Sequence, residues 1–212
     1  MSVILHQMEL GPMQNFEYFI GCEETKQVAV VDPAWDVDFL FKTAEEKGYT
    51  IVKVLLTHGH PDHTEGAEAM TERFNIPVLV SADESPFYMP ECPNLVKIKD
   101  GDRIPIGKIT LECLSTPGHA SGCVCFKCGD ILLTGDTLFV NACGRCDLPG
   151  GDAKALYHSL YDVILKLPDS AIIYPGHRYG PWPHSTLKKQ RKVNPYLTCK
   201  SEEEFLTTRM GY

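Results

Sequence analysis

The sequence predicts an α+β fold in which two β-sheets pack face to face and helices cover their outer sides. Two observations predict it. Segments with strand and helix patterns alternate in the N-terminal half, and a run of strands followed by helix, strand and helix makes up the rest. No internal repeat or linker divides the 212 residues, and their 43% hydrophobic content suffices for one sizeable core. A single domain over residues 1–212 is therefore expected, with a short helical extension at about 185–212.

The N-terminal half begins with short segments in which apolar and polar residues alternate, as in half-buried strands. The polar turn at 22–26 predicts a β-hairpin. Asp36 suits the N-cap of a helix that Gly48 ends. The elements expected in this half are strands at 3–10, 17–21, 27–31, 54–56 and 77–80 and helices at about 36–47 and 65–74.

The C-terminal half consists of strands joined by glycine turns, after a proline-containing passage at 82–94 that has no predicted element. Asp152 begins a helix with apolar residues at helical spacing. His119, Asp136 and His177 each follow a strand end, and loops on a rigid scaffold are where functional groups are expected. The strands expected in this half lie at 104–107, 109–114, 122–126, 131–134 and 171–174.

The composition argues against several classes of partner. A formal net charge of -8 disfavours a nucleic-acid backbone, because neutralising phosphates needs a basic face. No apolar run approaches the roughly 20 residues that span a bilayer, and the N-terminus lacks the pattern of a secretory signal. The nine cysteines are odd in number and scattered, as in a reducing compartment. We therefore expect a cytoplasmic protein that acts on a small molecule, without a nucleic-acid or membrane partner.

The segment from Val54 to Gly66 is the most informative part of the chain. An apolar run typical of a buried strand ends there in three histidines and an aspartate. Gly59 and Pro61 argue against a regular helix across them, so a tight loop is expected. A lone histidine is usually a satisfied surface or core residue, but this crowded set suits zinc, iron or manganese. The predicted ligands in this loop are His58, His60, Asp62 and His63.

The loop resembles the T-H-x-H-x-D-H loop of the metallo-β-lactamase superfamily, matched here from Thr57 to His63. The resemblance extends over nearly the whole chain and keeps the superfamily's order of motifs. It implies an αββα sandwich with the metal ligands on loops along one edge, and a metal-dependent enzyme. The further matching segments are Thr116-Pro117-Gly118-His119, Leu133-Thr134-Gly135-Asp136-Thr137-Leu138-Phe139 and Tyr174-Pro175-Gly176-His177.

The resemblance divides seven side chains between two divalent metal ions, with zinc as the first expectation and iron or manganese as alternatives. Two ions about 3.5–4 Å apart bind a bridging hydroxide at neutral pH and polarise a carbonyl group. Direct catalytic roles are therefore expected for Asp62, Asp136 and His60. The implied ligands are His58, His60 and His119 for one ion, Asp62, His63 and His177 for the other, and Asp136 as the bridge between them.

Thr57 and Asp32 are expected to support the ligands from behind. A metal-bound imidazole usually donates its other N–H group to an acceptor, which either side chain offers. Because Asp32 precedes Pro33, it also fits a plain turn residue, and that alternative stays open.

Residues 142–152 resemble the loop beside the active site in the glyoxalase II (hydroxyacylglutathione hydrolase) branch of the superfamily. Arg145 and Cys146 are the substrate-binding candidates in this loop, because a guanidinium group makes two parallel hydrogen bonds to a carboxylate. An ion pair between Arg145 and Asp147 or Asp152 is an equally open alternative.

Two departures from glyoxalase II concern glutathione. That branch has a lysine and a tyrosine where this chain has Arg145 and Cys146, and its C-terminal helical domain helps to hold glutathione. Only 35 residues (212 − 177) follow His177 here. Hydrolysis of a thioester is thus better supported than glutathione as its thiol, although a glutathione-type thioester is one candidate substrate.

The main rival interpretation is an oxidoreductase. Persulfide dioxygenases have a similar loop and use one iron ion, whose ligands match His60, His119 and Asp136 here. A complete two-ion ligand set favours the hydrolase, because open-site oxygen chemistry needs one ion only. β-Lactamase and nuclease activities rank lower, and a binding module without catalysis ranks last.

Two pairs of cysteines have C-x-x-C spacing, Cys125 with Cys128 and Cys143 with Cys146, and together they imitate a four-cysteine zinc site. Cys123 and Cys125 alternate along a predicted strand, however, so strand packing is the preferred explanation of the first pair.

Overall fold

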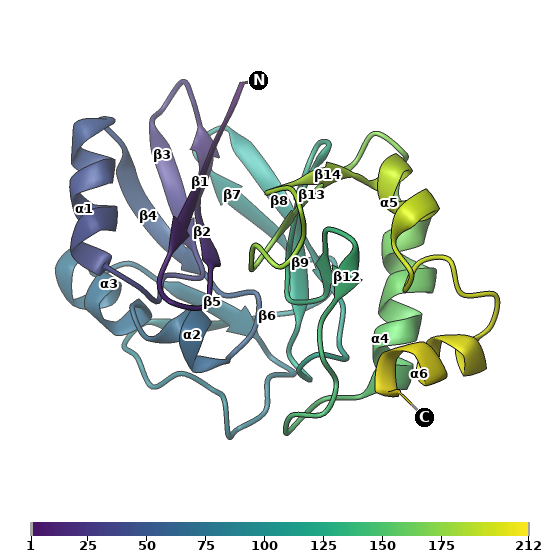
Figure 1. The fold of residues 1–212 in the computed structure, drawn as a ribbon. Helices are drawn as coiled ribbons and strands as arrows, with labels where there is room; N and C mark the ends of the chain where they lie inside the picture. The colour runs from purple at the N-terminus through teal and green to yellow at the C-terminus, as the bar shows by residue number, and fades with distance from the viewer. Residues whose placement is uncertain (1, 212) are drawn as a thin grey trace.

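The computed structural model describes residues 2–211 and contains two six-stranded sheets that lie face to face (Figure 1). The first sheet comprises, in spatial order, β1 (Val3–Leu10), β2 (Asn15–Cys22), β3 (Gln27–Val31), β4 (Thr50–Leu55), β5 (Val78–Ser81) and β6 (Leu95–Ile98). β1, β2 and β3 pair antiparallel, whereas β3 to β6 pair parallel. The hairpin expected around residues 22–26 is therefore confirmed.

The second sheet contains the strands of the C-terminal half. Its spatial order is β14 (Ser185–Thr186), β13 (Ile172–Pro175), β10 (Ile131–Gly135), β9 (Val124–Cys128), β8 (Ile109–Ser115) and β7 (Arg103–Ile106). A small separate hairpin joins β11 (Leu138–Phe139) to β12 (Ala142–Cys143). The predicted sandwich of two packed sheets is thus confirmed.

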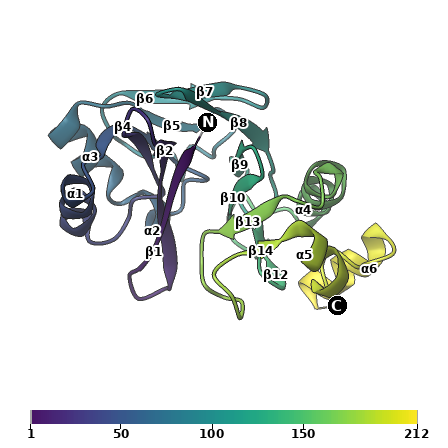
Figure 2. The same cartoon turned by 90° about the horizontal axis from the view of Figure 1, so that it is seen from above.

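Helices cover the outer faces of both sheets, as the view from above shows (Figure 2). On the first sheet lie α1 (Val37–Glu46) and α3 (Ala67–Phe74); on the second lie α4 (Ala153–His158), α5 (Leu187–Val193) and α6 (Glu202–Met210). Asp36 caps α1 as expected, because its side chain accepts the backbone N–H of Phe39. Asp152 caps α4 in the same way, and α4 continues through a π-helical and a 3-10 turn to Lys166.

Three layers of apolar side chains hold the elements together. Between the sheets, Tyr18 and Ile20 from β2 pack with Leu111 and Phe126. Outside the first sheet, the helices contribute buried residues such as Leu40 and Met70, and outside the second they contribute residues such as Leu156, Leu160 and Phe205. Each Å² of apolar surface that is buried stabilises the fold by about 25 cal/mol, so the three layers give the site a rigid support.

Several elements differ from the prediction. The histidine-rich segment contains a one-turn helix, α2 (Pro61–Thr64), where a loop without helix was expected. Pro61 occupies the first helical position, where no backbone N–H is needed, so the proline begins this helix. The prediction also missed β6, because its residues Val96 and Lys97 are both exposed and leave no apolar alternation to recognise. The two-residue strands β11, β12 and β14 carry no pattern either.

The topology brings the carboxyl ends of several strands to one edge of the sandwich. β10 pairs parallel with β13, and β9 pairs antiparallel with both β8 and β10, so β8, β10 and β13 run in one direction. His119, Asp136 and His177 follow the ends of these three strands, and His58 follows the end of β4 in the other sheet. Residues far apart in the sequence therefore meet at this edge.

Candidate metal centre

All seven predicted metal ligands converge at this edge, in overlapping groups of three whose ligand atoms lie within 4.8 Å of one another. The groups are His58, His60 and His119; His58, His63 and Asp136; and Asp62, His63 and His177. The first and the last of these are the two ligand sets that the resemblance implied, and they are called the first group and the second group from here on. All the imidazoles are buried, which limits competition from water.

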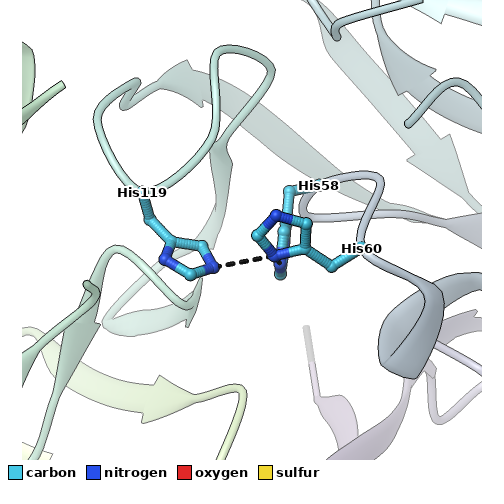
Figure 3. A group of neighbouring side chains, drawn as sticks. All are labelled: His58, His60 and His119. Atoms are coloured by element: carbon cyan, nitrogen blue, oxygen red, sulfur yellow. Dashed lines mark hydrogen bonds between the residues drawn. The ribbon is translucent and has the colours of Figure 1, made fainter. Parts of the chain in front are cut away.

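The first group is held together around His60, as Figure 3 shows. Nδ1 of His60 lies 3.0 Å from Nε2 of His58 and 2.9 Å from Nε2 of His119. His58 and His60 come from the loop after β4, and His119 comes from the loop after β8. Three ring nitrogens from two loops thus point to one position.

The second group lies beside it. Nε2 of His63 lies 3.1 Å from Nε2 of His177, and Oδ2 of Asp62 lies 3.5 Å from the former nitrogen and 3.4 Å from the latter. Asp62 and His63 belong to α2, whereas His177 follows β13. The one-turn helix therefore contributes two adjacent ligands.

Asp136 spans the two groups. Its Oδ2 lies 3.6 Å from Nε2 of His119 in the first group and 3.4 Å from Nε2 of His177 in the second. Its Oδ1 lies 3.5 Å from Nε2 of His63. This position agrees with the bridging role that the resemblance implied.

Asp32 and Thr57 support imidazoles of both groups. Oδ1 and Oδ2 of Asp32 accept hydrogen bonds of 2.7 Å from the backbone N–H and the hydroxyl of Thr57. Because the Thr57 hydroxyl donates its proton to Asp32, its oxygen is free to accept from Nδ1 of His58, 3.1 Å away. Oδ2 of Asp32 also lies 3.1 Å from Nδ1 of His63. Both residues therefore lie within hydrogen-bonding distance of predicted ligands.

Backbone carbonyl groups orient two more imidazoles. Nδ1 of His119 lies 2.8 Å from the carbonyl oxygen of Arg145, and Nδ1 of His177 lies 3.0 Å from that of Met13. A carbonyl oxygen only accepts, so in the neutral form of each ring Nδ1 carries the proton and Nε2 presents a lone pair to the centre.

The donor set fits a divalent metal ion. Inward-facing lone pairs at about 3 Å repel one another unless a cation lies between them. Oδ1 of Asp136 is buried and accepts no hydrogen bond from any residue between 2 and 211, as expected of an oxygen that is available to a cation. Burial, together with neighbouring imidazoles, lowers the pKa of His58 well below its usual value and that of His60 to about 4, so both rings are neutral and able to ligate.

The carboxylates make the second group strongly attractive to positive charge. Burial by itself lowers the pKa of His177, but the charge of Asp136 and hydrogen bonds to Asp136 and Asp62 outweigh it and raise the pKa to about 10. Burial raises the pKa of Asp136, yet the facing imidazoles of His63 and His177 outweigh burial and lower it to about 2. Asp136 is therefore ionised at neutral pH and supplies negative charge to a bound ion.

A cavity of about 270 Å³ opens onto this cluster. One part of its wall is apolar and another carries two guanidinium groups, those of Arg145 and Arg209. Tyr179 stacks on the ring of His177, with centroids 4.5 Å apart and planes 6° apart. The apolar wall is formed by Met13, Phe139, Ala142, Cys143, Leu148 and Tyr179. An organic substrate with an acidic group is the natural complement of such a cavity.

The two substrate-binding candidates differ in position. Arg145 lines the cavity, and its Nε and Nη2 also donate hydrogen bonds of 2.7 Å to the carboxylate of Asp147. The ion pair with Asp147 therefore exists, whereas Asp152 instead caps α4. Cys146 is buried and is not among the lining residues; Cys143 is.

Sequence reasoning missed several residues around the cluster. Arg209 comes from the distant helix α6, and Glu84 and Tyr88 come from the passage at 82–94 that had no predicted element. The ring of Tyr88 lies 4.5 Å from that of His60, measured between centroids. Only Tyr179 carried a signal, because it follows the ligand His177 closely in the sequence.

The cysteines form no metal site among residues 2–211, because every potential ligand cluster found there consists of histidine and aspartate. All nine thiols are free. Cys125 is buried within β9, in agreement with strand packing as its role, whereas Cys123 is buried in the turn just before that strand.

Comparison with known proteins places the chain in a family. A profile of the metallo-β-lactamase superfamily matches residues 10–177. The probable polyketide biosynthesis zinc-dependent hydrolase BaeB of Bacillus velezensis is 32% identical, over 96% of this chain and 89% of its own. Human mitochondrial persulfide dioxygenase ETHE1 is 31% identical, over 95% of this chain and 78% of its own. A hydroxyacylglutathione hydrolase of a Polaromonas species is 37% identical, over 78% of this chain and 63% of its own.

The crystal structure of ETHE1 from Myxococcus xanthus is similar throughout, with a TM-score of 0.89, 32% identity, and coverage of 99% of this chain and 92% of that one. The relatives thus include hydrolases and a dioxygenase, and the glyoxalase II branch is represented by a match over a smaller part of the chain. Between residues 2 and 211, no helix has both the length and the apolar character that crossing a bilayer requires. The two-sheet sandwich, the converging histidine and aspartate side chains and these matches show that the chain belongs to the metallo-β-lactamase superfamily.

Proposed function

We propose that this protein is a metal-dependent hydrolase that cleaves thioester bonds and uses two divalent ions. The observation that carries the proposal is the position of Asp136, whose carboxylate lies 3.4–3.6 Å from ligand nitrogens of both groups. A carboxylate shared in this way suits a pair of ions. When bound, such a pair activates water as a nucleophile and polarises the carbonyl group under attack.

The residues of the chain contribute orientation and selectivity. The buried hydrogen bonds from Asp32, Thr57 and backbone carbonyls fix the tautomers of the imidazoles before any substrate arrives, so little reorganisation is needed during the reaction. The apolar wall excludes water from the acyl part of a substrate. Tyr179, which covers His177, provides a flat surface beside the cluster.

The substrate proposed here is a thioester whose thiol part carries a carboxylate. Arg145 and Arg209 form the basic part of the cavity wall, and the guanidinium of Arg209 has no carboxylate within 4 Å among the residues described. A guanidinium group binds a carboxylate through two parallel hydrogen bonds. A glutathione-type thioester is one molecule with these properties, and the hydroxyacylglutathione hydrolase among the relatives supports it.

Zinc is the ion that we propose for the hydrolase. Histidine and aspartate without cysteine suit zinc, and BaeB is described as zinc-dependent. The same donor set also suits iron, which the imidazoles and carboxylates accept equally well.

A second candidate function is that of a persulfide dioxygenase with one iron ion. It is favoured by the 95% coverage of this chain in the match to human ETHE1, and by the proximity of His60, His119 and Asp136. Nε2 of His119 lies 2.9 Å from Nδ1 of His60 and 3.6 Å from Oδ2 of Asp136. Two histidines and one carboxylate are a usual ligand set for iron enzymes that activate oxygen.

One experiment separates the two functions. Protein purified without added metal is analysed for zinc and iron, and the same sample is assayed for hydrolysis of S-lactoylglutathione and for oxygen uptake with glutathione persulfide. If the protein is the proposed hydrolase, thioester turnover should increase with metal content and reach its maximum at two ions per chain. Asp62→Ala sharpens the comparison, because Asp62 belongs only to the second group. The change should abolish hydrolysis that depends on two metal ions. Oxygen uptake at a single iron held by His60, His119 and Asp136 should remain largely intact.

A further inference from the structure

Glu84 is a buried acid that lies outside the ligand set. Only 4% of its surface is exposed. Its Oε2 accepts a hydrogen bond of 2.7 Å from the backbone N–H of Gly59, the residue between His58 and His60, and its Oε1 accepts one of 2.8 Å from Ser85. Burying a carboxylate is costly, so its retention here needs a specific partner.

The same carboxylate also touches the loop of the third ligand in the first group. A methyl group on Gly122, which closely follows His119, would lie 2.6 Å from Oε2 of Glu84, so Glu84 packs against this glycine without room for a side chain between them. A methyl group on Gly59 would lie 2.2 Å from the backbone carbonyl oxygen of Tyr88, so the two backbones approach each other closely. The passage around Glu84 therefore clamps the loop of His58 and His60 against the loop of His119.

Asn15 makes the corresponding contacts in the second group. Its Nδ2 donates to the carbonyl oxygen of Asp62 at 2.8 Å and to Oδ2 of the same residue at 3.1 Å. Its Oδ1 accepts a bond of 2.9 Å from Nε1 of Trp35. An indole nitrogen only donates, so Trp35 fixes the orientation of the amide and directs its NH₂ group towards Asp62.

We propose that Glu84 and Asn15 are positioning residues that act on separate ions of the pair, Glu84 on the ion held by His58, His60 and His119 and Asn15 on the ion held by Asp62, His63 and His177. The inference rests on the two-ion site of the proposed function. Neither residue offers an atom to the metal clusters themselves. Glu84 acts through the backbone between His58 and His60, and Asn15 acts through the backbone and carboxylate of Asp62.

Asp32 provides the internal comparison. It supports His58 through Thr57 and contacts His63 directly, so it acts on both groups. Replacing it should weaken both ions, whereas each of the two positioning residues should weaken one. A general loss of stability cannot produce this pattern, because it would affect both sites in every variant.

The test uses the full chain, stripped of metal with a chelator and titrated with Zn²⁺ in competition with a chromophoric chelator. Glu84→Ala should weaken one of the two binding steps by about 10–100-fold and leave the other within about threefold. Asn15→Ala should weaken the other step by a similar factor. Crystals of each variant, soaked in limiting Zn²⁺, identify the depleted position through anomalous scattering at the zinc edge.

Controls keep the test decisive if a variant folds poorly. Glu84→Gln retains one acceptor oxygen and should give a smaller loss at the same ion. Asn15→Leu fills the same volume without the hydrogen bonds and should match Asn15→Ala. Asp83→Asn, at the exposed neighbour of Glu84, removes a similar charge and should leave both affinities unchanged. Asp32→Asn should weaken both.

The inference is overturned if Glu84→Ala and Asn15→Ala deplete the same ion, both ions equally, or neither. A wild-type protein that takes up only one Zn²⁺ overturns the two-ion function instead. The inference is then tested at that single site. Its Zn²⁺ affinity must fall on replacing Glu84 if the ion is in the first group, or Asn15 if it is in the second, and must not change on replacing the other residue.

Discussion

Nε2 of His63 lies 3.1 Å from Nε2 of His177, although each ring uses its Nδ1 for a hydrogen bond to an oxygen atom. When both rings are neutral, two lone pairs therefore face each other inside the protein; without an ion His177 holds a proton at neutral pH, because its pKa is raised to about 10. Only a proton or a metal ion between them removes the repulsion. Because α2 carries the first ring and the loop after β13 carries the second, an ion at this point joins the two sheets.

Removal of metal should therefore destabilise the protein. An ion that binds only the native state contributes about 4 kcal/mol when its free concentration is 1,000 times its Kd. In a chain of this length, that corresponds to a fall of roughly 8–16 °C in Tm after chelation. Calorimetry with zinc and with excess chelator measures the difference. An unchanged Tm would show that the cluster does not hold an ion that matters to the fold.

Asp136→Ala should remove nearly all activity and leave the fold intact, because the carboxylate contacts both ligand groups while the apolar layers do not depend on it. Circular dichroism checks the fold, and kcat/KM measures the activity. Asp38→Ala, at an exposed acid on α1, is the matched control and should behave like the wild type. Activity within about tenfold of the wild type, equivalent to about 1.4 kcal/mol in the barrier, would contradict the bridging role.

Arg145→Lys should raise KM for a thioester with a carboxylate in its thiol part and change kcat little, because lysine cannot reproduce the two parallel hydrogen bonds of a guanidinium group. A neutral thioester should be almost unaffected. The measurement is steady-state kinetics with both substrates.

The ion pair between Arg145 and Asp147 supplies the control for this prediction. Both side chains are about half exposed, so the pair contributes little stability. If Arg145→Lys lowers activity equally with both substrates, or if it only lowers Tm as Asp147→Asn does, the arginine is a partner for Asp147 and not a substrate contact.

Glu17→Gln should change how stability depends on pH. Glu17 is fully buried, and burial raises its pKa from 4.5 to about 7, although the N–H groups of Trp35 and Ala34 oppose the shift. Between these two values the unfolded chain has lost the proton that the folded chain still holds. The free energy of unfolding of the wild type therefore falls as pH rises from about 4.5 to about 7.

The glutamine variant lacks this proton, so its stability should not show that fall. The difference amounts to something on the order of 3 kcal/mol across the window, because each pKa unit corresponds to about 1.4 kcal/mol. Urea unfolding of both proteins at pH 5 and pH 8, at constant zinc, measures it. Parallel pH profiles would show that Glu17 does not retain its proton in the folded state.

The residues of the candidate metal centre could be predicted from the sequence because each is marked locally. His58, His60, Asp62 and His63 form one short motif, and His119, Asp136 and His177 each follow a strand that a short apolar run already indicates. The packed sheets could be predicted as well, since strand and helix periodicities appear within single elements.

What holds these ligands in place was decided by the tertiary structure alone. Glu84 reaches Gly59, and Asn15 reaches Asp62, across separations at which sequence periodicity carries no information. Arg209 joins the cavity only because α6 folds back beside the loop of Arg145, and Cys143 rather than Cys146 faces the cavity because of the small hairpin of β11 and β12. Local patterns determine which chemical groups the chain offers, but loop packing determines which of them meet, because contacts between distant segments depend on the whole set of buried surfaces.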